Sequence, residues 1–432
     1  MKHAWFACAL SALAVACSGS GSPAGGAPSS SGAGGAGIGG DGTASAGDGS
    51  AARAGAGAGG GGGSPSAEVV SGTPDANGWL LVPPTDAHLF YNGRVDRANP
   101  AAYRFAYPAV SIRAHFVGTG ISLSLEDHGQ GTPTSSNFYD VVVDGGLPTV
   151  LPVTADQTEY PLADALPSGE HTVEVFKRIE SAPGGSPDAG LGEFMGFLVP
   201  MGTTLLPVTA RPHRIEAVGD SITCGYGVEL STMTPDAAHF STQNENAHHS
   251  YVALAAALLD AEYQAVAYSG RGMSRNYADS GGLTLPDMYK LTLPDEPQGP
   301  VWDPTVSVPD VVVINLGTND FSTVGVDRDL FRTKYEDFLA DLRTDYPSAT
   351  LLATLGPMLS DYYPVGAAAW TNSQADVQAA VQARNDAGDP NVSFLAFAPQ
   401  TGPWGEDWHP TVAEQQTMAN ALIAKIKAAR GW

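Results

Sequence analysis

The second half of the chain, from about residue 212 to 432, alternates compact apolar runs with stretches of helical period. The runs HRIEAV, YQAVAY, DVVVINL, ATLLATL and VSFLAF lack polar alternation, which is typical of strands covered on both faces. Between and after them lie DRDLFRTKYEDFLADLRTDY, SQADVQAAVQARNDAG and TVAEQQTMANALIAKIKAAR, which have a helical pattern. The first of these places six apolar residues on one face: Leu330, Phe331, Tyr335, Phe338, Leu339 and Leu342. The rhythm predicts an α/β domain over residues 212–432, with a mostly parallel five-stranded sheet and helices on both faces.

Residues 76–205 have a different period. The runs AVSIRAHFVG, GISLSLED, FYDVVVDGG, HTVEVFKR and FMGFLV alternate apolar and polar residues and are rich in β-branched and aromatic side chains. Turn sequences such as Asp144-Gly145 separate them. This pattern predicts an all-β, jelly-roll-like sandwich ahead of the α/β domain.

The N-terminal residues resemble an export signal. Lys2 and His3 precede an apolar run that is too short to span a membrane, and residues 1–17 end in LAVAC. This ending resembles a lipobox with Cys17 as the lipidated residue, and secretion without a lipid is the alternative. Residues 18–72 are mostly Gly, Ser and Ala, the composition of a disordered linker. We expect a bacterial lipoprotein at the cell surface or in the periplasm, or otherwise a secreted protein.

Charge and cysteine content exclude several classes of partner and structure. The chain has 21 Lys and Arg against 45 Asp and Glu, a formal net charge of −24. Such acidity argues against binding nucleic acid or an anionic membrane surface, so the lipid anchor is the expected membrane contact. Cys8 lies in the signal and Cys17 at its end, which leaves Cys224 without a partner for an internal disulfide. We expect Cys224 to be a small buried packing residue and the protein to be a monomer.

Polar residues and glycines follow the predicted strands where each one ends. Ser221 lies in a Gly-Asp-Ser turn, Gly270 and Asn319 follow the next two strands, and His409 precedes the last helix. Since parallel strands share one carboxyl edge, we expect these four residues to meet there. Histidine can take the proton of a serine nucleophile. The N–H groups of Ser221 and Gly270 and the amide of Asn319 can hold the oxyanion, so the pattern predicts a serine hydrolase that needs no cofactor.

These four residues also match the blocks of the SGNH (GDSL) hydrolase superfamily. Thr223 stands where the G-x-S-x-G elbow of ordinary α/β-hydrolases needs its second glycine. Over about residues 80–430, GDSITCGYG, NENAHHSY, SGRGMSRNY, DWHP and FYNGRVDR resemble family two of the carbohydrate esterases. The resemblance implies a β-sandwich before the SGNH domain. It also implies an esterase that removes acetyl groups from plant polysaccharides such as xylan or glucomannan through an acetyl-enzyme.

Two other functions fit the same residues. The protein could be an SGNH esterase or lipase acting on other short-chain esters, or a surface carbohydrate-binding protein with little activity. Trp404, Trp408 and Trp302 are candidate platforms for a sugar substrate. His248 and His249 are adjacent and lack the i, i+4 spacing of a helical metal motif, so we expect no metal there.

The group that orients His409 has three candidates. The superfamily's acid lies three residues before the histidine, a position occupied here by Glu406, and Asp407 lies one residue closer. Some members of family two are said to use a backbone carbonyl instead. We favour Asp407, with Glu406 as the alternative acid and a carbonyl as the third possibility. His409 is expected to titrate near its ordinary pKa of ~6.5.

Overall fold

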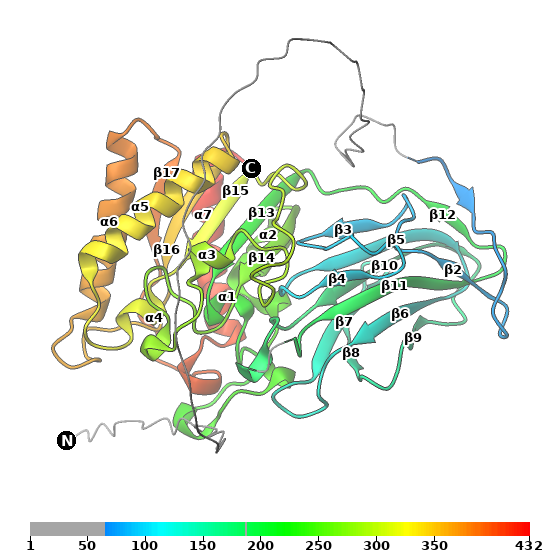
Figure 1. Cartoon of the computed structure of the whole chain (residues 1–432), viewed down its shortest axis with the longest axis horizontal. Coiled ribbons are helices and arrows are strands. Elements are labelled where there is room, and N and C mark those ends of the chain that lie inside the picture. Colours follow the sequence, from blue (N-terminus) through cyan, green and yellow to red (C-terminus); the bar gives the residue numbers. More distant parts are fainter. Residues whose placement is uncertain (1–64, 186–187) are drawn as a thin grey trace, which may run out of the picture. The chain divides into compact units, whose positions relative to one another are not determined.

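The computed structural model describes residues 65–185 and 188–432. The predicted signal peptide, Cys17 and the linker up to residue 64 lie outside these residues. In the described part, two antiparallel sheets precede a third, parallel sheet along the chain (Figure 1). Among the helices described, none is long and apolar enough to cross a membrane.

The two antiparallel sheets form the predicted sandwich. The seven-stranded sheet has the order β1 (Glu68–Val69), β12 (Thr204–Leu206), β5 (Ser111–Gly118), β10 (Gly169–Lys177), β7 (Asn137–Val143) and β8 (Thr149–Val153), with β3 (Phe90–Asn92) also paired to β5. The five-stranded sheet has the order β2 (Trp79–Val82), β11 (Gly192–Pro200), β6 (Ile121–Asp127) and β9 (Glu159–Ala163), with β4 (Tyr103–Phe105) paired to β11. Apolar residues of both sheets, among them Phe116, Leu123 and Phe197, pack into one core.

The sandwich begins earlier than the sequence pattern predicts. Strand β1 pairs antiparallel with β12, with Glu68 opposite Leu205 and Val69 opposite Thr204. The linker boundary at residue 72 is therefore wrong for this segment. A strand of two residues at a sheet edge has too few side chains to produce a visible alternation.

The parallel sheet confirms the predicted α/β domain. Its strand order is β14 (Ala261–Ala267), β13 (His213–Gly219), β15 (Val311–Asn315), β16 (Thr350–Leu355) and β17 (Val392–Ala396), and every pairing is parallel. Successive residues point to opposite faces and both faces are buried. Val312 and Ile314 pack into one core, whereas Val311 and Val313 pack into the other.

Helices cover both faces of the parallel sheet. The helices are α1 (Ser221–Cys224), α2 (Tyr251–Leu258), α3 (Leu285–Met288), α4 (Thr318–Phe321), α5 (Arg328–Asp345), α6 (Ala369–Asp386) and α7 (Val412–Arg430). Short 3-10 helices are η1 (Pro183–Gly185), η2 (Pro235–Ala237), η3 (Thr242–Asn244), η4 (Ala247–His249), η5 (Tyr277–Asp279) and η6 (Glu406–Trp408). Side chains of α3, α5 and α6 pack into one core, and those of α1, α2 and α7 into the other. Figure 1 shows α5 and α6 together on one side of the sheet.

Helix α5 follows its predicted pattern with one exception. Asp327 caps it by accepting a hydrogen bond from Leu330 N–H at 3.0 Å. Five of the six predicted core residues are buried, but Leu330 is 44% exposed. Leu330 lies in the first turn, at the edge of the apolar face, and is not part of the buried face of the helix.

The sandwich contacts the α/β domain beside the edge strand β14. The buried Arg94 of the sandwich donates to Leu291 O at 2.9 Å, and its guanidinium lies 4.5 Å from the centre of the Tyr289 ring. Arg113 on β5 forms an ion pair with Glu262 on β14. These contacts are buried or nearly so, and they hold the two predicted domains together.

Candidate active site

Ser221 stands at the junction between strand β13 and helix α1. The strand ends at Gly219, where an added Cβ would come within 2.1 Å of a side-chain oxygen. Asp220 caps the helix, because its carboxylate accepts from Ile222 N–H at 3.0 Å. Gly225 ends the helix in a left-handed conformation, with φ of 75°. The Ser221 N–H is thus the first of a helix and has no helical carbonyl to bond.

His409 reaches Ser221 from the loop that precedes α7. Its Nε2 lies 2.7 Å from Ser221 Oγ, and its Nδ1 lies 2.9 Å from the backbone oxygen of Glu406. A neutral imidazole that donates from Nδ1 leaves Nε2 free to accept the serine proton. The ring is stacked on Tyr226, with centroids 4.0 Å apart. This is the geometry of a nucleophile and its general base.

The favoured partner of His409, Asp407, is directed elsewhere. Its carboxylate accepts hydrogen bonds from Tyr226 OH at 2.7 Å and from His239 Nδ1 at 3.0 Å. The imidazole donates to the carbonyl of Glu406 instead. The prediction that Asp407 orients the ring by direct contact is therefore wrong in this structure, and the carbonyl is the candidate that fits.

The side chain of Glu406 does not take that role either. Its carboxylate accepts from Ser241 N–H at 2.9 Å and from the amide of Asn244 at 2.6 Å. These bonds attach the loop before α7 to the segment around η3. Glu406 thus acts on His409 through its backbone and on the neighbouring loop through its side chain.

A tight left-handed turn brings the Glu406 carbonyl to the imidazole. Asp407 and Trp408 have φ of 45° and 62°, which is unusual for residues other than glycine. The chain folds back so that the Glu406 carbonyl accepts from both the backbone N–H and the ring Nδ1 of His409, each at 2.9 Å. Such conformations cost roughly 1–3 kcal/mol each and cluster at functional sites.

Burial changes the titration of His409. The side chain is 7% exposed, and burial lowers the pKa of His409 to about 4, although the Glu406 carbonyl and the charge of Asp407 act in the opposite direction. The imidazole is therefore neutral at pH 6–8 and ready to accept a proton. The expected titration near ~6.5 does not hold for this buried ring.

The predicted oxyanion residues lie on neighbouring loops at the same sheet edge. The amide of Asn319 donates to the Arg271 carbonyl at 2.8 Å and lies 3.4 Å from the Asp220 carboxylate. Asn319 thereby links the residue before Ser221 with the residue after Gly270. Gly270 has φ of 78°, and an added Cβ would meet open space. The requirement for glycine is thus the positive φ.

Asp320, which sequence reasoning missed, fixes the loop that follows Gly270. Its buried carboxylate accepts from the N–H groups of Met273, Ser274 and Arg275, each at 2.8–2.9 Å. Residues 319 and 320 therefore hold the same loop through one side chain each. The adjacent Asp in GTND was the available signal.

Comparisons with known proteins agree with this site. Residues 91–208 match the model "Carbohydrate esterase 2 N-terminal" and residues 217–416 match the "GDSL-like Lipase/Acylhydrolase family". The structure of a family two carbohydrate esterase from Clostridium thermocellum in complex with cellohexaose is 35% identical, with a TM-score of 0.71. That match covers 80% of this chain and 99% of the other. The chain belongs to carbohydrate esterase family two. It is accordingly a carboxylic-ester hydrolase of the GDSL type.

Two curated relatives are also similar to this family-two esterase. The cellulase/esterase CelE of Acetivibrio thermocellus is 36% identical over 352 residues, which are 80% of this chain but 40% of that protein. The chain thus spans less than half of this relative. An acetylxylan esterase / glucomannan deacetylase of Cellvibrio japonicus is 29% identical over 350 residues, covering 81% of this chain and 90% of that protein.

The three predicted tryptophan platforms of the esterase differ in position. Trp404 and Trp408 are half-buried on the loop that carries His409, and Trp404 pairs through its backbone with Thr232. Trp302 is 9% exposed, and the Arg94 guanidinium lies 5.3 Å from its ring centre. Because its ring is covered by the sandwich, the prediction that Trp302 stacks on substrate is wrong. Trp404 and Trp408 remain predictions.

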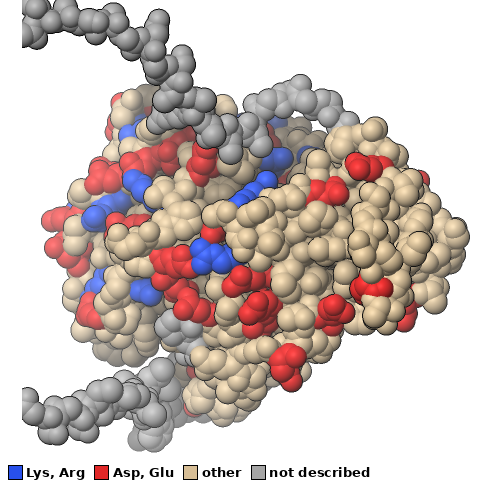
Figure 2. Space-filling model, turned by 45° about the vertical axis from the view of Figure 1, so that its right-hand side comes forward, with Lys and Arg blue, Asp and Glu red and all other residues tan. Residues whose placement is uncertain are grey.

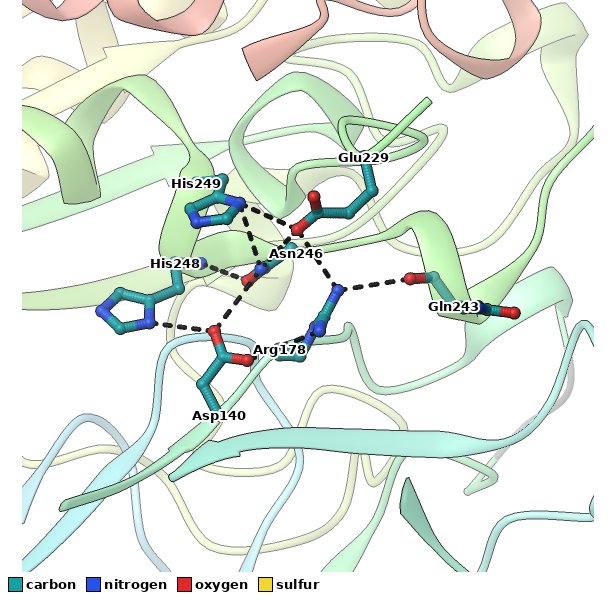
Figure 3. Close-up of polar contacts among 7 residues, drawn as sticks. All are labelled: Asp140, Arg178, Glu229, Gln243, Asn246, His248 and His249. Carbon is teal, nitrogen blue, oxygen red and sulfur yellow. Dashed lines mark hydrogen bonds and ion pairs between the residues drawn. The ribbon is translucent and has the colours of Figure 1, made fainter. Parts of the chain in front are cut away.

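The paired histidines of the esterase face carboxylates. His248 Nδ1 lies 3.0 Å from Asp140, and His249 Nδ1 lies 2.8 Å from Glu229 (Figure 3). They belong to a polar network between the sandwich and the α/β domain. Among the described residues, Cys224 is buried, as predicted. Its sulfur and one carboxylate oxygen each of Glu180 and Glu245 lie within 4.8 Å of one another.

Proposed function

We propose that this esterase removes O-acetyl groups from a plant-type polysaccharide, such as xylan or glucomannan, through an acetyl-enzyme. The observation that carries the proposal is the 2.7 Å contact between Ser221 Oγ and His409 Nε2, with the other ring nitrogen held by the Glu406 carbonyl. No catalytic carboxylate is required, since the carbonyl fixes the ring orientation and the proton on Nδ1.

Each half-reaction uses His409 first as base and then as acid. Ser221 Oγ bonds to the acetyl carbon while His409 Nε2 takes the hydroxyl proton. The tetrahedral oxyanion accepts hydrogen bonds from the N–H groups of Ser221 and Gly270. It also accepts from the Asn319 N–H that does not bond to the Arg271 carbonyl, in place of the 3.4 Å contact of that amide with Asp220. The ester C–O bond then breaks, and His409 gives its proton to the sugar oxygen. Water repeats the sequence on the acetyl-enzyme and releases acetate.

Exposed aromatic residues support a sugar substrate. Tyr362 and Tyr363 are 87% and 64% exposed on the loop after β16, and so at the carboxyl edge that also holds Ser221. Sequence reasoning missed them, although two adjacent tyrosines before a proline were a visible signal. On the face shown in Figure 2, acidic side chains are widespread and large areas carry no charge. A neutral glycan suits such a surface better than a polyanion.

The names of two relatives also support this substrate class. Two Cellvibrio japonicus proteins that are 29% and 28% identical are named acetylxylan esterase / glucomannan deacetylase. We extend that activity to this chain. Export, lipidation of Cys17 and a monomeric state are proposed on the sequence alone, and they suit an enzyme whose substrate lies outside the cell.

The test is acetate release from acetylated xylan and from acetylated glucomannan by the parent protein and its Ser221→Ala variant. We expect release from at least one glycan by the parent and none by the variant. If the parent cleaves 4-nitrophenyl acetate but neither glycan, the proposed mechanism stands, and an esterase acting on other short-chain esters is the better description. If the parent cleaves none of the three, the protein is better described as a carbohydrate-binding module, which binding of cellohexaose to both proteins would support.

A further inference from the structure

Glu180, a residue of the sandwich, touches the loop that carries Gly270. It lies in the segment after β10 and is 2% exposed. Its Oε2 accepts the hydrogen bond of Ser269 N–H at 2.6 Å. Ser269 directly precedes Gly270, whose N–H belongs to the oxyanion hole in the proposed mechanism. A carboxylate that accepts at this distance makes one of the stronger hydrogen bonds in proteins.

The segment that carries Glu180 is held at the boundary between the sandwich and the α/β domain. The neighbouring Arg178 is 4% exposed, and its Nη1 lies 3.4 Å from the Asp140 carboxylate on β7. Its Nη2 lies 3.3 Å from the Glu229 carboxylate and 3.2 Å from the Gln243 carbonyl (Figure 3). Through these bonds, Arg178 connects the sandwich to the α/β domain two residues before Glu180. Glu180 is therefore held beside the domain boundary by bonds that do not involve the loop that carries Gly270.

A buried lysine balances the charge of this carboxylate. Lys177 is fully buried and its Nζ donates to the Glu180 carbonyl at 3.1 Å. Glu245 accepts from Glu180 N–H at 3.1 Å. Burial raises the pKa of Glu180 to about 7 and that of Glu245 well above its ordinary value. Burial also lowers the pKa of Lys177 to about 8, although the charges of Glu245, Asp127 and Glu180 act in the opposite direction, so below that pH the cluster contains its own cation.

We propose that Glu180 is a positioning residue for the oxyanion hole: by holding Ser269 N–H, it fixes where the N–H of Gly270 points. The positive φ of Gly270 and the open space around it leave that peptide little support of its own. A donor misplaced by about 1 Å can cost roughly a hundredfold in rate. The sandwich thus contributes to turnover through one side chain.

The experiment compares Glu180→Ala and Glu180→Gln with the parent, and uses Glu245→Gln as the matched control. Glutamine at 245 keeps the acceptor for Glu180 N–H and does not touch Ser269. Cleavage of 4-nitrophenyl acetate at pH 8, where Glu180 is ionised, gives kcat and KM. Inhibition by phenylboronic acid, whose serine adduct places an oxygen in the hole, reports on the donors directly. Circular dichroism and thermal unfolding check the fold of each variant.

We expect kcat to fall about a hundredfold in Glu180→Ala and about tenfold in Glu180→Gln, which keeps an oxygen but loses the charge. KM should stay within about twofold, and boronate affinity should fall in parallel with kcat. Glu245→Gln should match the parent within about twofold. Unchanged kcat or boronate affinity in the Glu180 variants would overturn the inference, and so would an equal loss in Glu245→Gln. If Glu180→Ala does not fold, Glu180→Gln decides.

The inference rests on the proposed mechanism, and the Ser221→Ala variant separates the two. If that variant still cleaves 4-nitrophenyl acetate, the mechanism itself is wrong. If it is inactive while the Glu180 variants keep full activity, the mechanism stands and the role of Glu180 is refuted.

Discussion

Two turns carry the proposed catalytic pair, Ser221 and His409, and they are built in opposite ways. The Ser221 turn follows ordinary helix chemistry, with an aspartate cap at Asp220 and a left-handed glycine at Gly225. The His409 turn has two consecutive non-glycine residues, Asp407 and Trp408, in the left-handed region. The first turn is closed by hydrogen bonds among its own residues, whereas the second is held in a strained conformation by what surrounds it.

The difference explains how His409 is oriented by a carbonyl instead of a carboxylate in this structure. Hydrogen bonds from Ser241 and Asn244 to the Glu406 side chain, and from Tyr226 to Asp407, surround the strained turn. The strain directs a carbonyl at the imidazole, which a relaxed turn would not do. Local propensity thus shapes the nucleophile's turn, and tertiary contacts shape the base's turn.

The largest expected effect is loss of either member of the pair. Ser221→Ala and His409→Ala should each lower kcat by about 10⁴-fold or more, because the serine and the base act as a unit. The double variant should be no worse than either single one. Rates with 4-nitrophenyl acetate measure this, with circular dichroism as the check on folding. Multiplicative losses in the double variant would mean that His409 is not the base for Ser221.

The pH profile distinguishes a buried base from an exposed one. His409 must be neutral to accept the proton, and burial places its pKa at about 4. Activity should therefore be constant between about pH 5.5 and 8 on account of this group, and fall about tenfold per unit as pH drops below about 4. Initial rates of kcat/KM across this range are the measurement, with recovery at pH 7 as the control. A midpoint near ~6.5 would contradict the burial of the ring.

Loss of the Asp220 cap from the turn that carries Ser221 should lower the stability of the protein. Asp220→Ala removes the acceptor for Ile222 N–H and should lower the free energy of unfolding by about 1–2 kcal/mol. Asp220→Asn keeps an oxygen at the same position and is the matched control. Urea unfolding of both variants provides the comparison. Equal stability of the alanine and asparagine variants would show that the cap contributes nothing.

The order of the two domains was readable from the sequence because both follow their hydrophobic periods. All five predicted apolar runs of the second domain are strands of one parallel sheet, and the alternating runs before them form the sandwich. Strand β1 was missed, since pairing at an edge needs only two residues. Six further strands of the sandwich were also missed, because runs of three to five residues show little alternation: β2, β3, β4, β8, β9 and β12. The exposure of Leu330 was missed because one helical turn at an edge of the apolar face can face either way.

The sequence predicted site residues only where they lie in the loops that follow the predicted strands. Ser221, Gly270, Asn319 and His409 lie in the expected loops, since the topology of a parallel sheet determines that edge. The contacts of Asp407 and of Trp302 depend on a strained turn and on a domain contact, neither of which has a sequence period. For the same reason Glu180 was not noticed, because its partner Ser269 lies 89 residues away.

The smallest expected effect bears on the strained turn. Asp407→Asn should change kcat by less than about threefold, because asparagine tolerates a positive φ and can still accept from Tyr226. Glu406→Gln should be similarly mild, since it leaves the backbone carbonyl in place. A carboxylate that oriented the histidine of a triad would instead be worth about 10⁴-fold. Steady-state kinetics on both variants therefore separate the two arrangements by several orders of magnitude.

Asp407→Val is the variant to compare with Asp407→Asn. A β-branched residue is disfavoured at positive φ, so this variant should lose activity even though Asp407→Asn does not. The loss should appear in kcat together with a rise in the pH midpoint, because a displaced loop exposes His409 and removes the burial that lowers its pKa. If the asparagine variant were as inactive as the valine variant, the charge of Asp407 would matter more than the shape of its turn. The carbonyl would then not be sufficient to orient the base.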